Sequence, residues 1–231
     1  MEMATSADLF LASFNRINKW LKDQLDNPKN MGFSEMVRRL NKKPELLANE
    51  YMDDLLQMAQ LRNAIVHDQI GTDFVIAEPN EWVVKRITEI EDALLQPELV
   101  LPRFQKKVTG FEITLPIHEI LKTIAKKRYS QFPLYQKGKF KGLITLRALG
   151  YWFAKESVKG EIILGNRLAD ELIIADGKVT NYQFVDSTTT VAQAKNMFHQ
   201  NALLEAILIT RDGDPDGNLL GIIRPRDLFN V

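Results

Sequence analysis

The sequence has no cysteine and only three histidines among its 231 residues. The absence of cysteine excludes a disulfide framework, a thiolate metal site and a cysteine nucleophile. It fits a reducing compartment, and we expect the protein to be cytoplasmic. No cluster of His, Asp and Glu has the spacing of metal ligands, so we expect no metal.

The sequence also lacks long apolar runs and an overall excess of charge. No stretch approaches the roughly 18 apolar residues of a membrane-spanning helix, and we expect neither a secretory signal, nor a membrane, nor DNA as a partner. The 30 basic residues balance the 30 acidic ones. Residues 1–97 nevertheless carry 11 basic and 16 acidic residues, whereas residues 98–231 carry 19 and 14. This asymmetry argues against nonspecific RNA binding by the first half and suits an anionic ligand in the second.

The length and the change of pattern along the chain predict two domains, residues 1–97 and 98–231. Apolar residues in the first domain follow the helical period, which predicts an all-helical bundle. We expect helices at Ser6–Leu25, from a cap at Ser34 to Leu40, from Pro44 towards His67, and at Glu81–Leu95. In the last helix Trp82 should face inward together with Ile87, Ile90 and Leu94.

The second domain contains an internal repeat. Pro116–Ile124 aligns with Thr190–Phe198 at an offset of 74, and both segments read as starts of amphipathic helices. Phe132–Tyr135 and Ala206–Ile209, short apolar strands, align at the same offset. After the turns that follow, Gln136–Lys141 and the longer Thr210–Asn218, the offset becomes 79. It then pairs Gly142–Ala148 with Gly221–Asp227.

This order of strand, helix, strand, turn, strand and helix resembles the CBS domain, which almost always occurs as a pair, the Bateman module. The resemblance covers about the last 130 residues, with the first repeat at about 102–157 and the second at about 176–231. It implies an α+β fold in which the helical bundle is followed by two β-α-β-β-α repeats packed sheet to sheet. It also implies a homodimer.

In the CBS family an adenine nucleotide binds where the glycine-led strand enters the last helix, at a pattern of Gly, two apolar residues, Thr or Ser, two variable residues, and Asp. The first junction here has Thr145 but Ala148 in place of the carboxylate. The second has Asp227 but Arg224 in place of the hydroxyl. The resemblance therefore points to a site centred on Asp227, with Arg224 and Arg226 as phosphate ligands.

By the same analogy, Val185 and Ile207 would clamp the adenine. The expected regulatory ligand is AMP, ADP, ATP or cyclic di-AMP. Purely structural interpretations stay open, because Asp227 near a helix start is stabilising without any ligand. Thr145 is first of all interpreted as a helix cap, and Arg147 as a solvated side chain.

A second pattern lies in the helical domain. Arg62, followed by the polar Asn63 and by His67 five positions after Arg62, resembles the motif of the HEPN superfamily of helical bundles. In that family such a motif serves metal-independent cleavage of RNA. His67 could take a proton from a ribose hydroxyl and Arg62 could hold the phosphate, although an ideal helix places them about 140° apart. In the alternative interpretation, His67 interacts with a helix C-terminus and Arg62 with a local carboxylate.

Two hypotheses follow for the whole chain. In the first, the protein is a noncatalytic regulatory sensor whose repeat pair binds an adenine nucleotide and whose helical domain dimerises or docks a partner. In the second, the helical domain is an endoribonuclease that the repeat pair regulates, and only then is RNA a partner.

Overall fold

The computed structural model describes residues 4–43, 46–66, 77–174 and 181–229. The chain divides into two compact units, residues 1–98 with 190–196 and residues 99–189 with 197–231. In the described ranges, no helix combines the length and the apolar character needed to cross a membrane.

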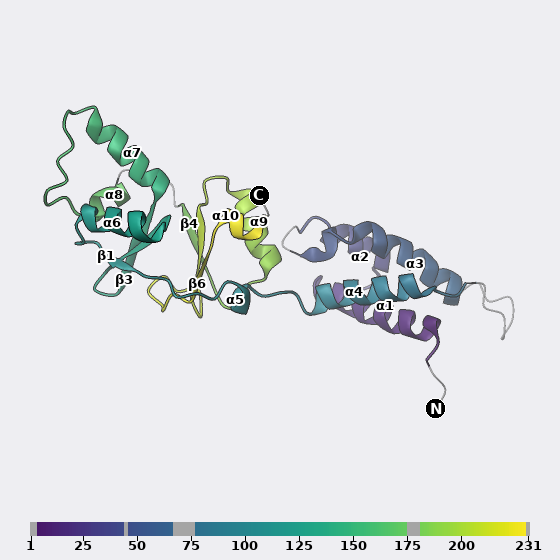
Figure 1. The fold of residues 1–231 in the computed structure, drawn as a ribbon. Helices are drawn as coiled ribbons and strands as arrows, with labels where there is room; N and C mark the ends of the chain where they lie inside the picture. Colours follow the sequence, from purple (N-terminus) through teal and green to yellow (C-terminus); the bar gives the residue numbers. More distant parts are fainter. Residues whose placement is uncertain (1–3, 44–45, 67–76, 175–180, 230–231) are drawn as a thin grey trace. The chain divides into compact units, whose positions relative to one another are not determined.

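The N-terminal unit is built from helices (Figure 1). They are α1 (Ser6–Asp23), α2 (Phe33–Leu40), a 3-10 turn (Leu47–Asn49), α3 (Met52–Val66) and α4 (Glu81–Leu95). The helical prediction is confirmed for the described residues, with one correction to the helix boundaries. Gly32, not Ser34, is the N-cap of α2. The helix α3 begins at Met52, after the 3-10 turn, and the expected start at Pro44 lies outside the described residues.

Apolar side chains of α1, α2, α3 and α4 form the core of this unit. Among them are Phe10, Ile17, Met36, Leu40, Leu55, Ile87 and Ile90, all fully buried. Trp82, expected to face inward, is instead 67% exposed. It precedes Ile87 by five residues, which turns its side chain about 140° away from the buried face of α4. The prediction for Trp82 was therefore wrong, while that for Ile87 and Ile90 was right.

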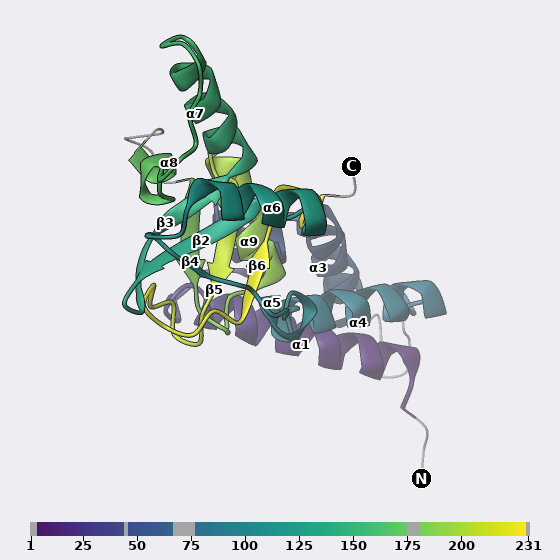
Figure 2. The same cartoon turned by 60° about the vertical axis from the view of Figure 1, so that its left-hand side comes forward.

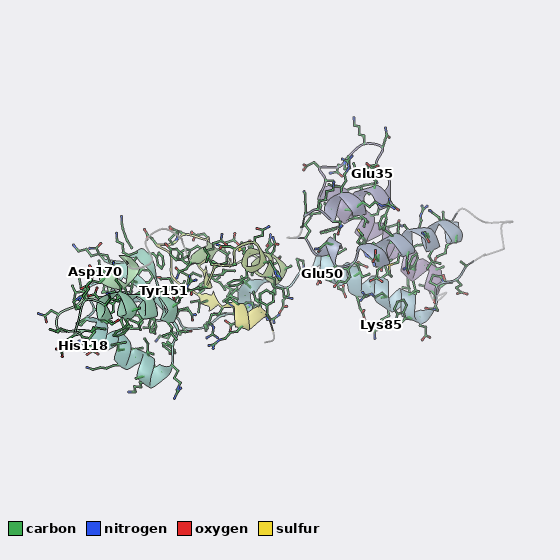
Figure 3. All side chains as sticks on the ribbon, turned by 90° about the horizontal axis from the view of Figure 1, so that it is seen from above. Glu35, Glu50, Lys85, His118, Tyr151 and Asp170 are labelled. Carbon is green, nitrogen blue, oxygen red and sulfur yellow. The ribbon has the colours of Figure 1, made fainter. Side chains whose placement is uncertain are left out.

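One ion pair also joins α1 to α4. Arg16 donates from Nη2 to Oε2 of the buried Glu91 at 2.8 Å, and a second contact runs from Arg16 Nε to the other carboxylate oxygen. Hydrogen bonds from Arg16, against the opposing effect of burial, hold the pKa of Glu91 below its usual value. Other charged side chains of the unit, such as Glu35 and Lys85, lie on its surface (Figure 3).

The second unit contains two three-stranded sheets of identical topology. The first comprises β1 (Phe111–Glu112), β2 (Gln131–Gln136) and β3 (Lys139–Thr145); the second comprises β4 (Tyr182–Val185), β5 (Ala206–Ile209) and β6 (Gly221–Ile223). In each sheet the first strand runs parallel to the second, and the third antiparallel to it.

The helices confirm the internal repeat. They are α6 (Ile117–Lys127) and α7 (Leu146–Ser157) in the first repeat, and α9 (Val191–Gln200) and α10 (Pro225–Leu228) in the second, with the short α5 (Val100–Arg103) and α8 (Asp170–Ile174) outside the pattern. The starts of α6 and α9 are 74 residues apart and those of α7 and α10 are 79 apart, as the sequence predicts. The first turn is shorter than expected, because only Lys137 and Gly138, both with positive φ, separate β2 from β3.

The two sheets pack against each other (Figures 1 and 2). Leu143 of the first sheet is buried with Ala206, Leu208 and Ile222 of the second. The ring of Phe140 meets Tyr182 and Phe184 edge-on, with centroid distances of 5.0 and 4.9 Å. The sheet-to-sheet arrangement implied by the CBS resemblance is therefore present.

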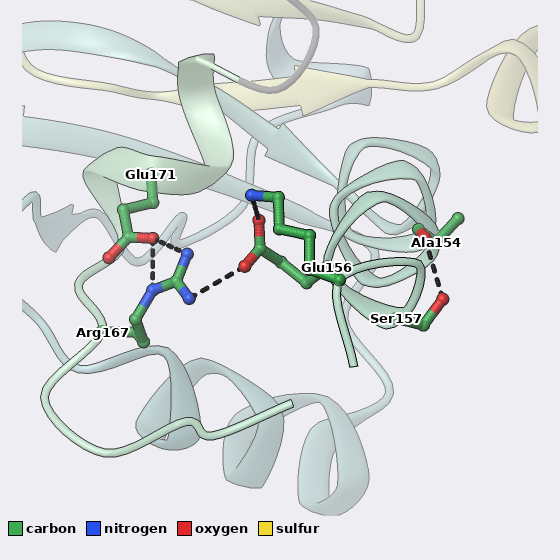
Figure 4. A network of polar contacts seen from close by, with 6 residues as sticks. Ala154, Glu156, Ser157, Arg167 and Glu171 are labelled. Carbon is green, nitrogen blue, oxygen red and sulfur yellow. Dashed lines mark hydrogen bonds and ion pairs between the residues drawn. The ribbon is translucent and has the colours of Figure 1, made fainter. Parts of the chain in front are cut away.

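The outer face of the first sheet is covered by α6, α7 and α8, which share a core with Phe132, Leu134 and Ile144. Arg167 fastens the segment between α7 and α8, as Figure 4 shows. Its guanidinium donates to Glu156 Oε2 at 3.0 Å and to Glu171 Oε2 at 2.5 Å. Tyr151 of α7 is exposed (Figure 3).

The two glycines that lead β3 and β6 differ in what surrounds them, and this difference is testable. A Cβ on Gly221 would lie 2.4 Å from the carbonyl oxygen of Phe104, a backbone atom, whereas a Cβ on Gly142 would meet the movable side chain of Ile173 at 3.1 Å. We expect Gly221→Ala to lower the free energy of unfolding of this unit by about 1–3 kcal/mol, because backbone must shift. Gly142→Ala, the matched control, should cost less. Urea unfolding of both variants checks this, and equal costs would contradict it.

Candidate functional site

The junction between β6 and α10 brings together two of the predicted site residues. Pro225 is the first residue of α10, and the backbone N–H of Arg224 donates to Asp227 Oδ2 at 2.8 Å. The Arg224 guanidinium donates to the same carboxylate through Nε at 2.8 Å and Nη2 at 2.6 Å. Asp227 thus accepts three hydrogen bonds from Arg224, and in this way it stabilises the start of α10 without a ligand.

Lys106, which the sequence did not single out, also lies at this junction. Its Nζ is 3.9 Å from Asp227 Oδ2. The segment between α5 and β1 packs against β6. Gln105 forms a β-bridge with Gly221, and the N–H of Lys106 donates to the carbonyl of Leu220 at 3.1 Å. The absent side chain of Gly221 permits this close approach. No sequence pattern marks such a lysine, since only the path of the chain places it there.

The charges at this junction shift the pKa values of Asp227 and Lys106. Burial opposes ionisation of Asp227, but hydrogen bonds from Arg224 and the charges of Lys106 and Arg224 outweigh it and lower its pKa. Burial lowers the pKa of Lys106, and the positive charges of Arg224 and Arg226 lower it further, against the attraction of Asp227. The junction is therefore partly shielded from water and crowded with positive charge.

A cavity of about 260 Å³ opens beside Arg224. Its cationic lining comprises Lys106, Lys107, Arg128 and Arg224, and its apolar lining comprises Val108, Tyr129 and Ile222. Ser130 and Gln131 complete part of the wall. We call this cavity the basic cleft. It draws residues from both repeats, including the part of the first repeat before β1, which explains why a single junction motif does not reveal it.

A second cavity of about 360 Å³ lies at the junction between β3 and α7. We call it the Glu205 cleft, because its lining pairs Arg147 with Glu205, alongside Thr145, Leu146, Ala202, Leu204 and Pro225. It shares Ser130 and Gln131 with the basic cleft. The two cavities are therefore neighbours.

The first junction is organised differently from the second. Thr145 is buried, and its Oγ1 accepts the N–H of Ala148 at 3.2 Å, so it caps α7. Ala148 is itself buried and leaves this position without a carboxylate. Arg147 is not simply solvated as expected, because its Nε lies 2.8 Å from Glu205 Oε1.

The two predicted adenine contacts are not among the described residues that line either cleft. Val185 and Ile207 are both buried. Strand alternation explains this, since Ala206 and Leu208 face the other sheet and Ile207 faces the opposite way. Val185 pairs with Ile209, two positions along the strand from Ile207, so it lies further from Arg224. The apolar wall nearest the charges is provided instead by Val108, Tyr129 and Ile222.

Arg226, Arg62 and Asn63 are not among the described residues that line either cleft. Arg226 is exposed on α10, and among the described residues it has no ion-pair partner. Arg62 and Asn63 lie on α3, where Arg62 Nη1 donates to Asn63 Oδ1 at 3.4 Å. His67 lies outside the described residues, so RNA cleavage stays a prediction from the sequence. Within the described ranges, no group of three or more His, Asp or Glu side chains could hold a metal ion.

The lowered pKa of Asp227 makes a prediction about stability and pH. A folded-state pKa below the ordinary value of 3.8 means that the ionised Asp227 stabilises the fold above that value and loses this contribution as the pH falls through the lowered pKa. Asp227→Asn keeps an acceptor for the N–H of Arg224 but removes the charge. We expect it to cost about 1–2 kcal/mol at pH 7, and the cost should shrink below pH 3.8. Urea unfolding at several pH values measures the difference; a cost that stays constant down to pH 3 would rule out this origin.

Comparison with known proteins identifies the second unit. The sequence model for the CBS domain matches residues 105–151 and 178–231. No curated protein matches the sequence.

Solved structures of CBS pairs resemble this chain at low sequence identity. The CBS domain pair of protein MJ0100, in complex with 5′-methylthioadenosine and S-adenosyl-L-methionine, is 16% identical, with 57% of this chain and 93% of that chain covered and a TM-score of 0.45. A signal-transduction protein with CBS domains from Burkholderia ambifaria is 16% identical over 54% of this chain and 81% of its own, with a TM-score of 0.41. CBSX2 from Arabidopsis thaliana is 11% identical over 58% and 92%, with a TM-score of 0.43. On the family match to both repeats, the C-terminal part of this chain is a tandem pair of CBS domains.

Proposed function

We propose that the CBS pair binds an adenine nucleotide in the basic cleft and that the protein is a noncatalytic regulatory sensor. One observation carries the proposal: four cationic side chains, Lys106, Lys107, Arg128 and Arg224, line a single cavity that also has an apolar wall. Sites for small organic anions combine these two features, because cations recognise phosphate and apolar side chains recognise a base.

Each part of a nucleotide has a matching group. Phosphate oxygens would accept hydrogen bonds from the lysines and arginines of the cleft, and the base would lie against Val108, Tyr129 and Ile222. Tyr129 offers an aromatic face for stacking, since 43% of its surface is exposed. Asp227 would accept from the ribose hydroxyls, as the CBS resemblance implies.

The carboxylate of Asp227 is already engaged. A carboxylate offers about four acceptor positions, and the three hydrogen bonds from Arg224 occupy most of them. Binding of a ribose would therefore turn the Arg224 guanidinium away from Asp227 and towards the phosphates. In this arrangement the ion pair between Arg224 and Asp227 is replaced by a contact of Arg224 with phosphate and a contact of Asp227 with ribose.

The size of the cleft favours a mononucleotide. Its volume of about 260 Å³ is close to the lower end of the roughly 300–1,000 Å³ typical of small-molecule sites. AMP, ADP or ATP fits this range better than cyclic di-AMP, which carries two adenosines.

The helical unit would convey the signal, as a dimerisation or partner-docking element. A nucleotide can act in this way only if it binds one arrangement of a homodimer, or one partner-bound state, more tightly than another. Sedimentation of the full chain with and without nucleotide would show whether assembly responds to the ligand.

Calorimetric titration of the purified chain with AMP, ADP, ATP and cyclic di-AMP tests the proposal. We expect at least one of the mononucleotides to bind, and Asp227→Ala to weaken it at least tenfold, because the ribose loses its acceptor. Asp227→Asn serves as a second variant that retains the backbone cap. Asp92→Ala, which removes an exposed carboxylate from α4, is the matched control and should bind as the wild type does. Binding by none of the four ligands, or equal binding by the Asp227 variants, would refute the proposal.

A further inference from the structure

Arg128, Gln131 and Arg224 of the basic cleft correspond in the repeat to Ala202, Glu205 and Thr145 of the Glu205 cleft, so the two clefts differ in charge at corresponding positions. The offset of 79 relates Arg147 to Arg226, and the offset of 74 relates Gln131 to Glu205 and Arg128 to Ala202. The first junction thus combines an arginine with a carboxylate, and the second combines an arginine with a neutral amide. The contacts of Glu205 at the first junction differ accordingly from those of Gln131 at the second.

At the first junction, Glu205 supplies an internal anion. Its Oε1 lies 2.8 Å from Arg147 Nε, and its Oε2 accepts from Asn181 Nδ2 at 2.8 Å. The backbone N–H of Glu205 also donates to the carbonyl of Asn181 at 2.8 Å. The carboxylate is therefore held from two sides, and only 20% of its side chain is exposed.

At the second junction no such anion is present among the described residues. Gln131 is neutral, and its Oε1 accepts from Ser130 Oγ at 2.7 Å. Arg128 stands where the first junction has Ala202, which adds a further positive charge to the wall. Arg226 lies close enough for its charge to act on Lys106. The carboxylate of Asp227 lies at this junction, and it is bound by Arg224.

We propose that Gln131 determines the specificity of the basic cleft by placing a neutral amide where the first junction has the Glu205 carboxylate, so that no internal anion competes with a phosphate chain for the cations of the cleft. The cleft then selects a ligand with several negative charges, a nucleoside di- or triphosphate, and each chain binds one. The identity of the base rests on the proposed function, whereas the subsite for phosphates does not depend on it.

Crowding of like charges supports this assignment. Lys106, Lys107, Arg128 and Arg224 line one small cavity, and the partly buried carboxylate of Asp227 lies beside Lys106. The lowered pKa of Lys106 reflects first its burial and then the neighbouring arginines. An anion in the cleft would relieve that repulsion, and a chain of phosphates would relieve it at several cations at once. A neutral or cationic adenosyl compound would not relieve the repulsion between these cations.

Gln131→Glu tests the inference, because it introduces the carboxylate of the first junction into the second. Calorimetric titrations with ATP and with inorganic tripolyphosphate would be compared for the wild type, Gln131→Glu and the neutral control Gln131→Met. We expect one ligand per wild-type chain, a loss of at least tenfold in affinity for both ligands in Gln131→Glu, and a change of less than threefold in Gln131→Met.

A double-mutant cycle identifies the partner of the new carboxylate. Arg226→Gln should weaken tripolyphosphate binding several-fold in the wild-type background and much less in the Gln131→Glu background, where the introduced carboxylate would already neutralise the arginine. Unchanged binding by Gln131→Glu would overturn the inference and leave the proposed function intact. Binding of tripolyphosphate without preference for ATP, lost in Gln131→Glu, would support the inference while removing the adenine assignment. No binding of either ligand would overturn both.

Discussion

Burial of apolar surface between the two three-stranded sheets is the constraint on which the candidate site depends. Phe140 packs edge-on between Tyr182 and Phe184, and Leu143 is buried with Leu208 and Ile222. Burial of this kind contributes roughly 25 cal/mol per Å² of apolar surface, and it fixes how the two repeats pack against each other. The basic cleft exists only when the repeats are packed in this way, because Arg128 and Lys106 come from the first repeat and Arg224 comes from the second.

The β3–α7 and β6–α10 junctions have equivalent positions in the two repeats, but their side chains form different contacts. Thr145 caps α7 through its hydroxyl, whereas at the second junction Asp227 reaches back to the N–H of Arg224. Each junction has thus kept one half of a reciprocal cap. The consequence is electrostatic: the first junction is neutralised internally by Glu205, and the second retains an excess of positive charge beside a cavity. Two repeats of the same fold can therefore differ at equivalent sites: one site has its positive charge neutralised by a protein carboxylate, and the other can accept an anionic ligand.

The parts of the fold that the sequence predicted are those that depend on local periodicity. The offsets of 74 and 79 located α6 and α9, β2 and β5, and the starts of α7 and α10, because apolar spacing and the leading glycines recur in both repeats. Errors arose where a single helical phase decided the outcome, as for Trp82, or where the chain turned more tightly than its composition suggests, as at Lys137–Gly138.

The candidate site was predictable only in part, for a physical reason. Arg224 and Asp227 share a junction and could be found from one motif. Lys106 reaches that junction because the chain passes across Gly221, and Arg147 meets Glu205 across the boundary between repeats. Such contacts between distant positions leave no periodic signal. The analogy that named Val185 and Ile207 likewise could not show that both side chains are buried.

A crystal structure of the full chain grown with ATP would show whether the basic cleft binds the nucleotide. We predict one nucleotide per chain in the basic cleft, with its phosphates within hydrogen-bonding distance of Lys106 and Arg224, and with the guanidinium of Arg224 turned away from Asp227. A nucleotide bound elsewhere, or an unoccupied cleft in which the Arg224–Asp227 pair persists at saturating ATP, would contradict this prediction.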